Sequence, residues 1–475
     1  MPEGPDRMSA LDAFFFYTEE DGRNHMHVGG FALADGTAPS AEEVAKALAP
    51  KIARIPRYTQ LARPAPLHVN RPEWVPAPDF DITEHVRTVT APEPGHDGLC
   101  RVVGDLISVQ LDRARPLWEV VVIDGISDGP SDDQFAIFWK IHHSMVDGVS
   151  GTQLLTILFD DSPDGPTTEL PPLPAGADVA PRSRLRSTTD AVTGLGKEAV
   201  GRVRSLRPST VTKAARVGAA GLALTRRNLM PDLRSPLTGP IGPTRSFDFC
   251  AIPFADVKTV RGAFGGTVND VVLTIVLDGF RELLESRGLE VKGKHLRLMN
   301  PVALRERDAE GRPLGDGTME TKASALMPRL PLDVDDPVTR LEFVRGHLAE
   351  LKQTAQADAV SAMNEIQAVL PGTLNAIYLR ASSAMPQRSL QTTVTNVHGP
   401  TIPLYLLGRP LRRIANYAPP FPVGARSSIT VYSYNGELVF GITTDRESLP
   451  DVDRIAAGIQ RSMDELLERA AVLNT

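Results

Sequence analysis

The sequence predicts an α/β protein built from two sheet-containing domains. Strand-like and helix-like segments alternate in both halves, and the 475-residue chain exceeds the size at which one core usually divides. The segment from Asp160 to Pro181 is dense in Pro, Gly and Asp, which is typical of a linker. We therefore predict an N-terminal domain at residues 1–160, a linker and basic segment at 161–240, and a C-terminal domain at 241–475.

In the first half, apolar residues at helical spacing predict helices, and short apolar runs rich in β-branched and aromatic residues predict strands. Ser40 and Glu43 have the spacing of a helix capping box. Trp118 introduces a strand that we expect to pair beside the strand that follows it; its own side chain is read either as core or as part of a substrate channel. The predicted segments are a strand ending at Gly29-Gly30, helices at 41–55, 98–111 and 149–159, and strands at 120–126 and 135–141.

The second half repeats this mixture of helices and strands. Thr267 to Asp270 is predicted to cap a long apolar helix, with Asn269 or Asp270 suited to the N-cap position. Asn435-Gly436 between two alternating segments is a strong hairpin signal. The predicted helices are 254–264, 271–284, 336–351 and 452–473, and the predicted strands are 295–301, 392–397, 427–434 and 437–443.

Composition favours a globular protein of ordinary hydrophobicity. Hydrophobic residues make up 42% and charged residues 23% of the chain. Only two cysteines are present, which argues against a disulfide scaffold or a cysteine-based metal site. There is no secretory signal pattern and no uninterrupted apolar run long enough to span a membrane. We expect a cytoplasmic protein with no metal, no cofactor and no nucleic-acid partner.

The charge is unevenly distributed along the chain. Residues 181–236 contain twelve Lys or Arg and three Asp or Glu, a net +9 within a chain of net charge −7, which leaves −16 for the rest. Small and apolar residues lie between these basic residues, a mixture found in helices that lie on anionic membrane surfaces. The segment is read either as a membrane- or lipid-droplet-docking element or as a basic helix packed across a domain seam.

One string, Ile141-His142-His143-Ser144-Met145-Val146-Asp147-Gly148, carries the chemistry. It follows an apolar strand and precedes a predicted helix. Because successive strand residues face opposite sides, only one of the two histidines can point into a given cavity. A neutral imidazole can remove a proton from a hydroxyl group, so the string predicts a general base.

The surrounding residues favour direct transfer between two bound substrates. No GxSxG nucleophile motif is present and no Cys–His pair is taken as a catalytic dyad, so a covalent acyl-enzyme is not expected. Asp147 either orients the histidine or pins the loop through an ion pair with Arg305; we favour the ion pair, because a buried carboxylate needs a partner. Gly148 leaves room for a substrate to pass close to the backbone.

His25 and His27 are the other histidines that the pattern brings together. They lie two residues apart and should share one face of their strand. A zinc site would need further ligands that the nearby sequence does not supply. We expect a structural or channel-lining role for this pair.

The HHxxxDG string resembles the signature of CoA-dependent acyltransferases, a superfamily that includes chloramphenicol acetyltransferase and peptide condensation domains. Further segments, in order along nearly the whole chain, resemble landmarks of the bacterial wax ester synthase/diacylglycerol acyltransferase family. They are Leu11-Asp12-Ala13-Phe14-Phe15, His25-Met26-His27-Val28-Gly29, Pro116-Leu117-Trp118-Glu119, Asn269-Asp270, Pro301-Val302-Ala303-Leu304-Arg305 and Ser433-Tyr434-Asn435-Gly436. Two segments depart from the family pattern: Asn396-Val397-His398-Gly399-Pro400, where Pro is usual in place of His, and Leu314-Gly315-Asp316, where Asn is usual in place of Asp. These departures concern acceptor preference more than reaction type.

The resemblance implies two chloramphenicol-acetyltransferase-like domains with mixed sheets and a substrate tunnel between them. His143 would be the base and His142 the opposite-facing, structural histidine. The substrates would be acyl-CoA and a fatty alcohol or diacylglycerol, and the location peripheral, at the inner membrane or lipid droplets. The expected oxyanion or substrate-channel residues are Asn269, Asp270, Asn396, Pro116, Leu117 and Trp118, with a backbone N–H near Gly148 as another oxyanion donor.

Two alternatives remain at this point. One is a condensation-type transferase that takes acyl groups from a carrier protein, although the chain has no evident carrier domain. The other is a non-catalytic lipid-binding protein, against which the intact HHxxxDG string argues.

Overall fold

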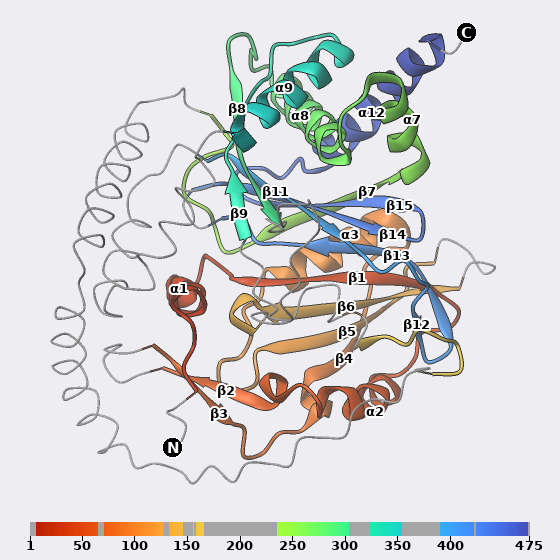
Figure 1. Ribbon diagram of the computed structural model, residues 1–475. Coiled ribbons are helices and arrows are strands. Elements are labelled where there is room, and N and C mark those ends of the chain that lie inside the picture. Colours follow the sequence, from red (N-terminus) through yellow and green to blue (C-terminus); the bar gives the residue numbers. More distant parts are fainter. Residues whose placement is uncertain are drawn as a thin grey trace, which may run out of the picture.

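The computed structural model describes residues 6–64, 71–127, 133–145, 155, 158–165, 235–303, 323–353, 390–421 and 424–473. Two β-sheets form its layers, and helices lie between them and on their outer faces (Figure 1). The α/β class predicted from the sequence is therefore confirmed.

The first sheet carries the start of the histidine string, Ile141 and His142. Its strand order is β12-β13-β1-β6-β5-β4, and only β4 and β5 run parallel to each other. The bounds are β1 His27–Asp35, β4 Val86–Thr90, β5 Trp118–Asp124, β6 Gln134–His142, β12 Tyr405–Leu406 and β13 Arg409–Tyr417. The predicted pairing of β5 beside β6 is confirmed, with Trp118 opposite Ile141.

Strand β1 does not end at Gly29-Gly30, as predicted, but continues to Asp35. The two glycines lie inside the strand because its neighbours approach closely there. A Cβ atom on Gly29 would lie 1.9 Å from the carbonyl oxygen of Trp139, and one on Gly30 would lie 2.5 Å from that of Ala415. Glycine at these positions therefore marks close backbone packing within the sheet.

Strands β12 and β13 come from the second half of the chain but belong to the first sheet. Gly29 of β1 lies opposite Tyr417 of β13 in an antiparallel register. The predicted domain boundaries at residues 160 and 240 stay a prediction. Because β12 and β13 join the first sheet, that sheet is not formed by the first half of the chain alone.

The second sheet is mixed and belongs to the second half. Its main path is β10-β8-β11-β14-β15-β7, with β9 paired to β8, and β8, β11 and β14 run parallel. The bounds are β7 Arg245–Pro253, β8 His295–Ala303, β9 Ala323–Leu326, β10 Arg329–Pro331, β11 Thr392–His398, β14 Ser427–Tyr434 and β15 Glu437–Asp445. The predicted hairpin is confirmed: Asn435 and Gly436 both have positive φ, 48° and 80°, as a type I′ turn requires.

Helices cover the second sheet on the side away from the first sheet (Figure 1). They are α7 Phe254–Phe264, α8 Val268–Ser286, α9 Pro337–Gln353 and α12 Asp453–Leu473. Thr267, and not Asn269 or Asp270, is the N-cap of α8; Asp270 is the third helical residue, and its carboxylate completes a capping box with Thr267. The helix thus begins three residues before the predicted start, because Thr267 supplies the hydroxyl that caps it.

The remaining helices belong to the first half. They are α1 Ala10–Thr18, α2 Ala41–Ile52 and α3 Gly95–Ile107, with 3-10 turns η1 Glu19–Asp21, η2 Pro56–Thr59, η4 Ile82–His85 and η5 His143–Met145, and a small two-stranded sheet of β2 Gln60–Arg63 and β3 Glu73–Pro76. The Ser40–Glu43 capping box of α2 is confirmed. Helix α3 begins at Gly95 and ends at Ile107, three to four residues before the predicted bounds at both ends.

Helix α3 lies at the seam between the two sheets. A hydrophobic cluster joins it to both, and its members include Val103 of α3, Phe138 of β6 and Phe249 of β7. Separate clusters fill the far side of each sheet. The seam is therefore part of the folded core.

Among the described residues no single helix has the length and hydropathy of a membrane span. Helices α7 and α8 pass that test only as a pair, and the chain bends by 103° between them.

Candidate functional site

The two histidines of the central string mark the end of strand β6. His142 is its last residue and His143 begins turn η5. The N–H of His142 donates to the carbonyl of Leu117 (2.9 Å), and the N–H of His143 donates to the carbonyl of Met26 (2.8 Å). Because the flanking chains hold both backbone N–H groups, the position of each histidine is fixed by the sheet.

Consecutive phenylalanines of helix α1 contact the consecutive histidines. Phe15 lies against His143, with ring centroids 4.0 Å apart, whereas Phe16 lies edge-on to His142 at 6.0 Å. His142 is fully buried and His143 is half-buried. The two imidazoles thus occupy different environments, as strand alternation requires.

His142 belongs to a buried polar group that resembles a hydrolase triad. Its Nδ1 lies 2.7 Å from Ser144 Oγ and accepts the Ser144 backbone N–H at 3.1 Å. Its Nε2 lies 3.4 Å from Glu19 Oε2, which is longer than a well-formed hydrogen bond. All three side chains are at most 3% exposed. Burial this deep favours a structural role for the group.

Glu19 links the two histidines through Met26. Its carboxylate accepts the Met26 backbone N–H, while the Met26 carbonyl holds His143. Burial raises the pKa of Glu19, but the neighbouring His142, the hydrogen bond from the Met26 N–H and the charge of Arg113 oppose this, and the net pKa is lowered. The side chain is therefore a carboxylate at neutral pH, a role that nothing in the sequence pattern indicated.

His25 and His27 share one face, as predicted, with stacked rings 5.6 Å apart. His25 Nε2 lies 2.8 Å from the Pro243 carbonyl, and His27 Nδ1 lies 3.2 Å from the Tyr417 hydroxyl. Burial lowers the pKa of both imidazoles. Their contacts join β1 to the second half of the chain, which favours the structural interpretation.

The Pro116-Leu117-Trp118 segment lies next to the histidines and is buried. Trp118 is 2% exposed, stacks on His85 at 4.4 Å and donates from Nε1 to the Tyr58 carbonyl at 2.8 Å. These contacts favour the core interpretation of Trp118. Leu117 contacts the site through its backbone, because its carbonyl oxygen accepts the His142 N–H.

Asn269, Asp270 and Asn396 belong to the second half. Asn269 Nδ2 donates to Asn300 Oδ1 at 3.1 Å, and Asn300 Nδ2 donates to the Val394 carbonyl at 2.8 Å. Asn396 lies two residues beyond Val394 on β11. The start of α8 is thus brought together with the parallel strands β8 and β11, while Asp270 is engaged in the capping box of α8.

Several predicted positions lie outside the described residues. They are Asp147, Gly148, Arg305, Leu314-Gly315-Asp316, the basic segment up to residue 234, and most of the predicted helix 149–159. Their roles stay predictions.

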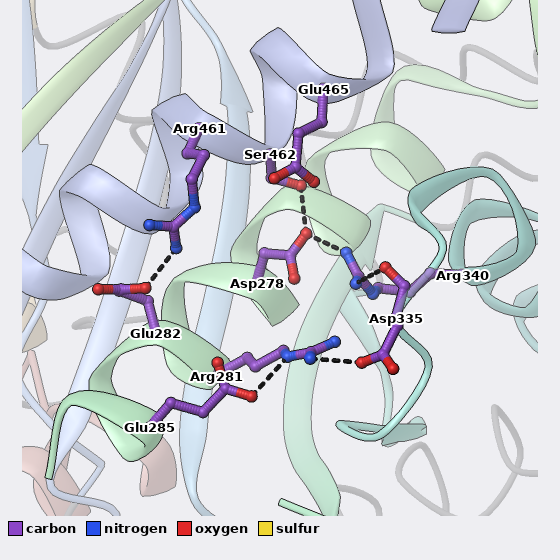
Figure 2. Close-up of a pocket in the computed structure, with 9 residues that line it drawn as sticks. All are labelled: Asp278, Arg281, Glu282, Glu285, Asp335, Arg340, Arg461, Ser462 and Glu465. Carbon is purple, nitrogen blue, oxygen red and sulfur yellow. Dashed lines mark hydrogen bonds and ion pairs between the residues drawn. The ribbon is translucent and has the colours of Figure 1, made fainter. Parts of the chain in front are cut away.

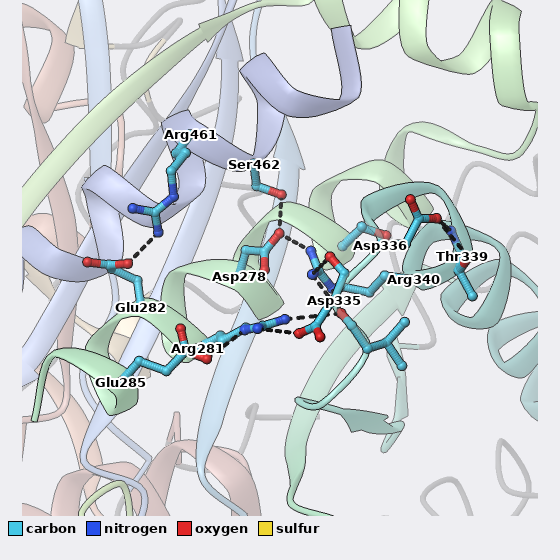
Figure 3. Close-up of polar contacts among 12 residues, drawn as sticks. Asp278, Arg281, Glu282, Glu285, Asp335, Asp336, Thr339, Arg340, Arg461 and Ser462 are labelled. Atoms are coloured by element: carbon cyan, nitrogen blue, oxygen red, sulfur yellow. Dashed lines mark hydrogen bonds and ion pairs between the residues drawn. The ribbon is translucent and has the colours of Figure 1, made fainter. Parts of the chain in front are cut away.

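A charged pocket lies among helices α8, α9 and α12, and has a volume of 350 Å³. Figure 2 shows its lining side chains pairing across the pocket. Arg340 contacts Asp278, which also accepts the Ser462 hydroxyl at 2.5 Å. Figure 3 shows the same contacts continuing to Arg281, which pairs with Asp335 and Glu285. The pocket's charges are used to hold the helices together, so it is a poor candidate for a substrate site.

A second group that the sequence analysis passed over is His96, Cys100 and Asp248. Its three potential ligand atoms all lie within 4.8 Å of one another. His96 and Cys100 are four residues apart, one helical turn, and this spacing was the available signal. Asp248, more than a hundred residues later, could not be assigned to them from the sequence.

Comparison with known proteins gives the family. The model of the wax ester synthase/diacylglycerol acyltransferase catalytic domain matches residues 8–272, and that of the WS/DGAT C-terminal domain matches residues 321–467. A Mycobacterium tuberculosis H37Rv protein named a probable diacylglycerol O-acyltransferase is 31% identical over 470 residues, which are 97% of this chain and 96% of that protein.

Solved structures confirm the predicted fold. The wax ester synthase/diacylglycerol acyltransferase from Marinobacter aquaeolei VT8 has a TM-score of 0.69 at 24% identity, over 98% of this chain and 100% of that one. The first condensation domain of the calcium-dependent antibiotic synthetase has a TM-score of 0.56 at 16% identity, over 99% and 97%. With family models in both halves and a relative similar over nearly its whole length, the chain belongs to the wax ester synthase/diacylglycerol acyltransferase family, acyltransferases that form wax ester or triacylglycerol.

Proposed function

We propose that the protein transfers a long-chain acyl group from acyl-CoA to the hydroxyl of a fatty alcohol or diacylglycerol, with His143 as general base. The placement of His143 carries this proposal. Its backbone is held by Met26 and its half-buried ring lies against Phe15, while His142 is locked in the core. A fixed, accessible imidazole is what proton removal from an acceptor hydroxyl requires.

The reaction then proceeds by direct transfer. His143 removes the acceptor proton, and the alkoxide oxygen forms a bond to the thioester carbonyl carbon. The tetrahedral oxyanion collapses, the carbon–sulfur bond breaks, and the CoA sulfur takes the proton from His143 and leaves as the thiol. Acyl-CoA is a substrate in this scheme and no cofactor is required.

A covalent acyl-enzyme is not part of the proposal. Burial raises the pKa of both cysteine thiols, Cys100 and Cys250, which makes them poor nucleophiles. Ser144, the serine beside His142, is 2% exposed. Neither kind of group is placed to attack a bound thioester.

Stabilisation of the oxyanion falls to donors from the second half or from the loop after His143. Asn269, Asn396 and a backbone N–H near Gly148 are the candidates, and removing one such donor typically costs about 3–4 kcal/mol of transition-state stabilisation.

Asp147 would hold the loop after His143 in place by forming an ion pair with Arg305. Strictly additive losses of stability in Asp147→Asn, Arg305→Ala and the double variant would discard the pairing.

The protein would work at a lipid surface, either the inner membrane or a lipid droplet. The net charge of +9 over residues 181–236 supports attraction to anionic lipid. Reversing the charge of Arg202, Arg204 and Arg207 should release the protein from anionic liposomes. Unchanged binding would favour the interpretation of this segment as a helix across the domain seam.

The main experiment is an acceptor panel with palmitoyl-CoA, scored by CoA release and by product mass. The panel contains hexadecanol, diacylglycerol and no acceptor. His143→Ala should abolish CoA release while the protein stays folded, and His347→Ala on helix α9 is the matched control. Rates near wild type for His143→Ala would show that His143 is not the general base. Activity with an acyl group on acyl-carrier protein, but none with acyl-CoA, would show that the acyl donor is the carrier protein and not CoA.

A further inference from the structure

His96, Cys100 and Asp248 bring three different ligand types together at the domain seam. His96 and Cys100 lie on one face of α3, and Asp248 lies on β7 of the second sheet. Cys100 and Asp248 are buried, and the His96 side chain is 47% exposed. The printed contacts of this group do not involve His143, the proposed base.

The contacts converge on one point and do not form a proton relay. His96 Nε2 lies 2.6 Å from Asp248 Oδ1 and 3.4 Å from Cys100 Sγ, and Sγ lies 3.5 Å from the same Oδ1. In a Cys–His–Asp relay, one ring nitrogen faces the thiol and the other faces the carboxylate. Here a single nitrogen faces both, so a nucleophilic triad is excluded by the geometry.

The same separations suit a metal ion. Tetrahedral zinc with bonds of about 2.0–2.3 Å places its ligand atoms about 3.3–3.6 Å apart. Both distances to Sγ already agree with this. The nitrogen–oxygen distance is shorter, because a hydrogen bond now joins these atoms, and it would have to open by about 0.7 Å to admit the ion.

The charges and the surroundings are also suitable. Zn²⁺ with one thiolate, one carboxylate and a neutral imidazole is electrically neutral, so no net charge is buried. Binding displaces the thiol proton and the proton between Nε2 and Oδ1 to solvent. The N–H of Phe249 donates to Asp248 Oδ1 at 2.7 Å and orients the carboxylate, as outer contacts commonly do at metal sites.

We propose that His96, Cys100 and Asp248 bind a zinc ion that links helix α3 to strand β7, with water in the fourth position beside the partly exposed His96. The backbone at this seam is already closely packed. A Cβ on Gly104 of α3 would lie 3.1 Å from the Arg245 carbonyl oxygen of β7, and Ser108 Oγ accepts the Arg245 N–H at 2.7 Å. The ion would therefore add a bond across an interface that is formed without it.

Cobalt titration of the full chain, after treatment with a chelator, tests this proposal directly. Co²⁺ should bind with one-to-one stoichiometry and give tetrahedral d–d bands together with a thiolate charge-transfer band, which Zn²⁺ then removes. Cys100→Ser should lose the charge-transfer band, whereas Cys250→Ser, which alters the buried cysteine outside the group, should keep it. His96→Ala, at a half-exposed position that should not prevent folding, is expected to weaken binding roughly tenfold or more.

At the same zinc concentration, zinc should also raise the melting temperature of the wild-type chain more than that of His96→Ala, because an ion that binds only the folded state stabilises it in proportion to its affinity. No charge-transfer band in the wild type would overturn the proposal. The same band and affinity in folded Cys100→Ser or His96→Ala would overturn it as well, since the metal would then be bound elsewhere.

Discussion

The carboxylate of Glu19 lies 3.4 Å from Nε2 of His142, and both side chains are excluded from solvent. The same carboxylate accepts the N–H of Met26, whose carbonyl accepts the N–H of His143. One buried acid thus fixes the structural histidine through its side chain and the proposed base through the backbone. The guanidinium group of Arg113 lies 3.7 Å from the same carboxylate.

Glu19→Gln should therefore destabilise the protein. The amide oxygen can still accept from Met26, but the negative charge that faces His142 is lost. We expect a loss of about 1–3 kcal/mol in the free energy of unfolding, measured by urea denaturation. Glu20→Gln, at the exposed neighbouring position, is the matched control. Equal unfolding midpoints for wild type and Glu19→Gln would show that the contact contributes nothing.

Ser144→Ala separates direct transfer from a covalent mechanism. If Ser144 only orients His142, the variant should lose about 1 kcal/mol of stability and keep its rate of CoA release within roughly tenfold of wild type. If it were a nucleophile, the rate would fall by roughly a thousandfold or more, because the covalent route would be lost. A palmitoyl adduct on this residue, sought by mass spectrometry of rapidly quenched enzyme, would contradict direct transfer.

Local signals in the sequence predicted most elements because their causes are local. The Ser40–Glu43 capping box and the Asn435-Gly436 turn each depend on residues within one turn of chain, and both are confirmed. The different contacts of His142 and His143, with Phe16 and Phe15, agree with what strand alternation predicts. These features needed no knowledge of distant partners.

The features that the sequence analysis predicted wrongly or omitted depend on contacts between segments that are distant in the sequence. Strand β13 carries three arginines and a proline, so it lacks a clear alternating pattern, and its place beside β1 is decided by a partner nearly four hundred residues earlier. Gly29 and Gly30 suggested a strand end, because the close approach of β6 and β13 is not visible in the sequence. Glu19 stands in a polar turn and was passed over for the same reason.

The buried Asp278–Arg340 pair should be strongly coupled. Burial raises the pKa of Asp278 and lowers that of Arg340, so each charge depends on the other. Asp278→Ala and Arg340→Ala should each cost about 3–5 kcal/mol, since each leaves an uncompensated buried charge. The double variant should lose clearly less than the sum of the two, as measured by urea denaturation.

The exposed Arg461–Glu282 pair beside the same pocket is the control for that cycle. Arg461→Ala should change stability by about 0–1 kcal/mol, because solvent screens its charge. Additive losses for Asp278 and Arg340 would mean that the two side chains do not stabilise each other.

Stability should fall as the pH decreases below 6.5, in part through His27. Burial and the charge of Lys140 lower its pKa well below the 6.5 expected for an exposed histidine. The unfolded chain therefore binds a proton at a pH where the folded protein does not. The contribution of this group is fully present above pH 6.5 and is lost progressively as the pH falls toward the folded pKa, by at most about 1.4 kcal/mol per pH unit.

His25 and His85 have lowered pKa values and add slopes of the same sign, whereas His96, whose pKa is raised by Asp248, opposes them. His27→Asn isolates one contribution, because its amide oxygen can replace Nδ1 as the partner of the Tyr417 hydroxyl without titrating. Urea denaturation of wild type and His27→Asn between pH 7.5 and about pH 5 should give curves that converge as the pH falls. Parallel curves over this range would show that His27 binds protons equally in the folded and unfolded states. The claim that the buried imidazole stays neutral in the folded protein would then be wrong.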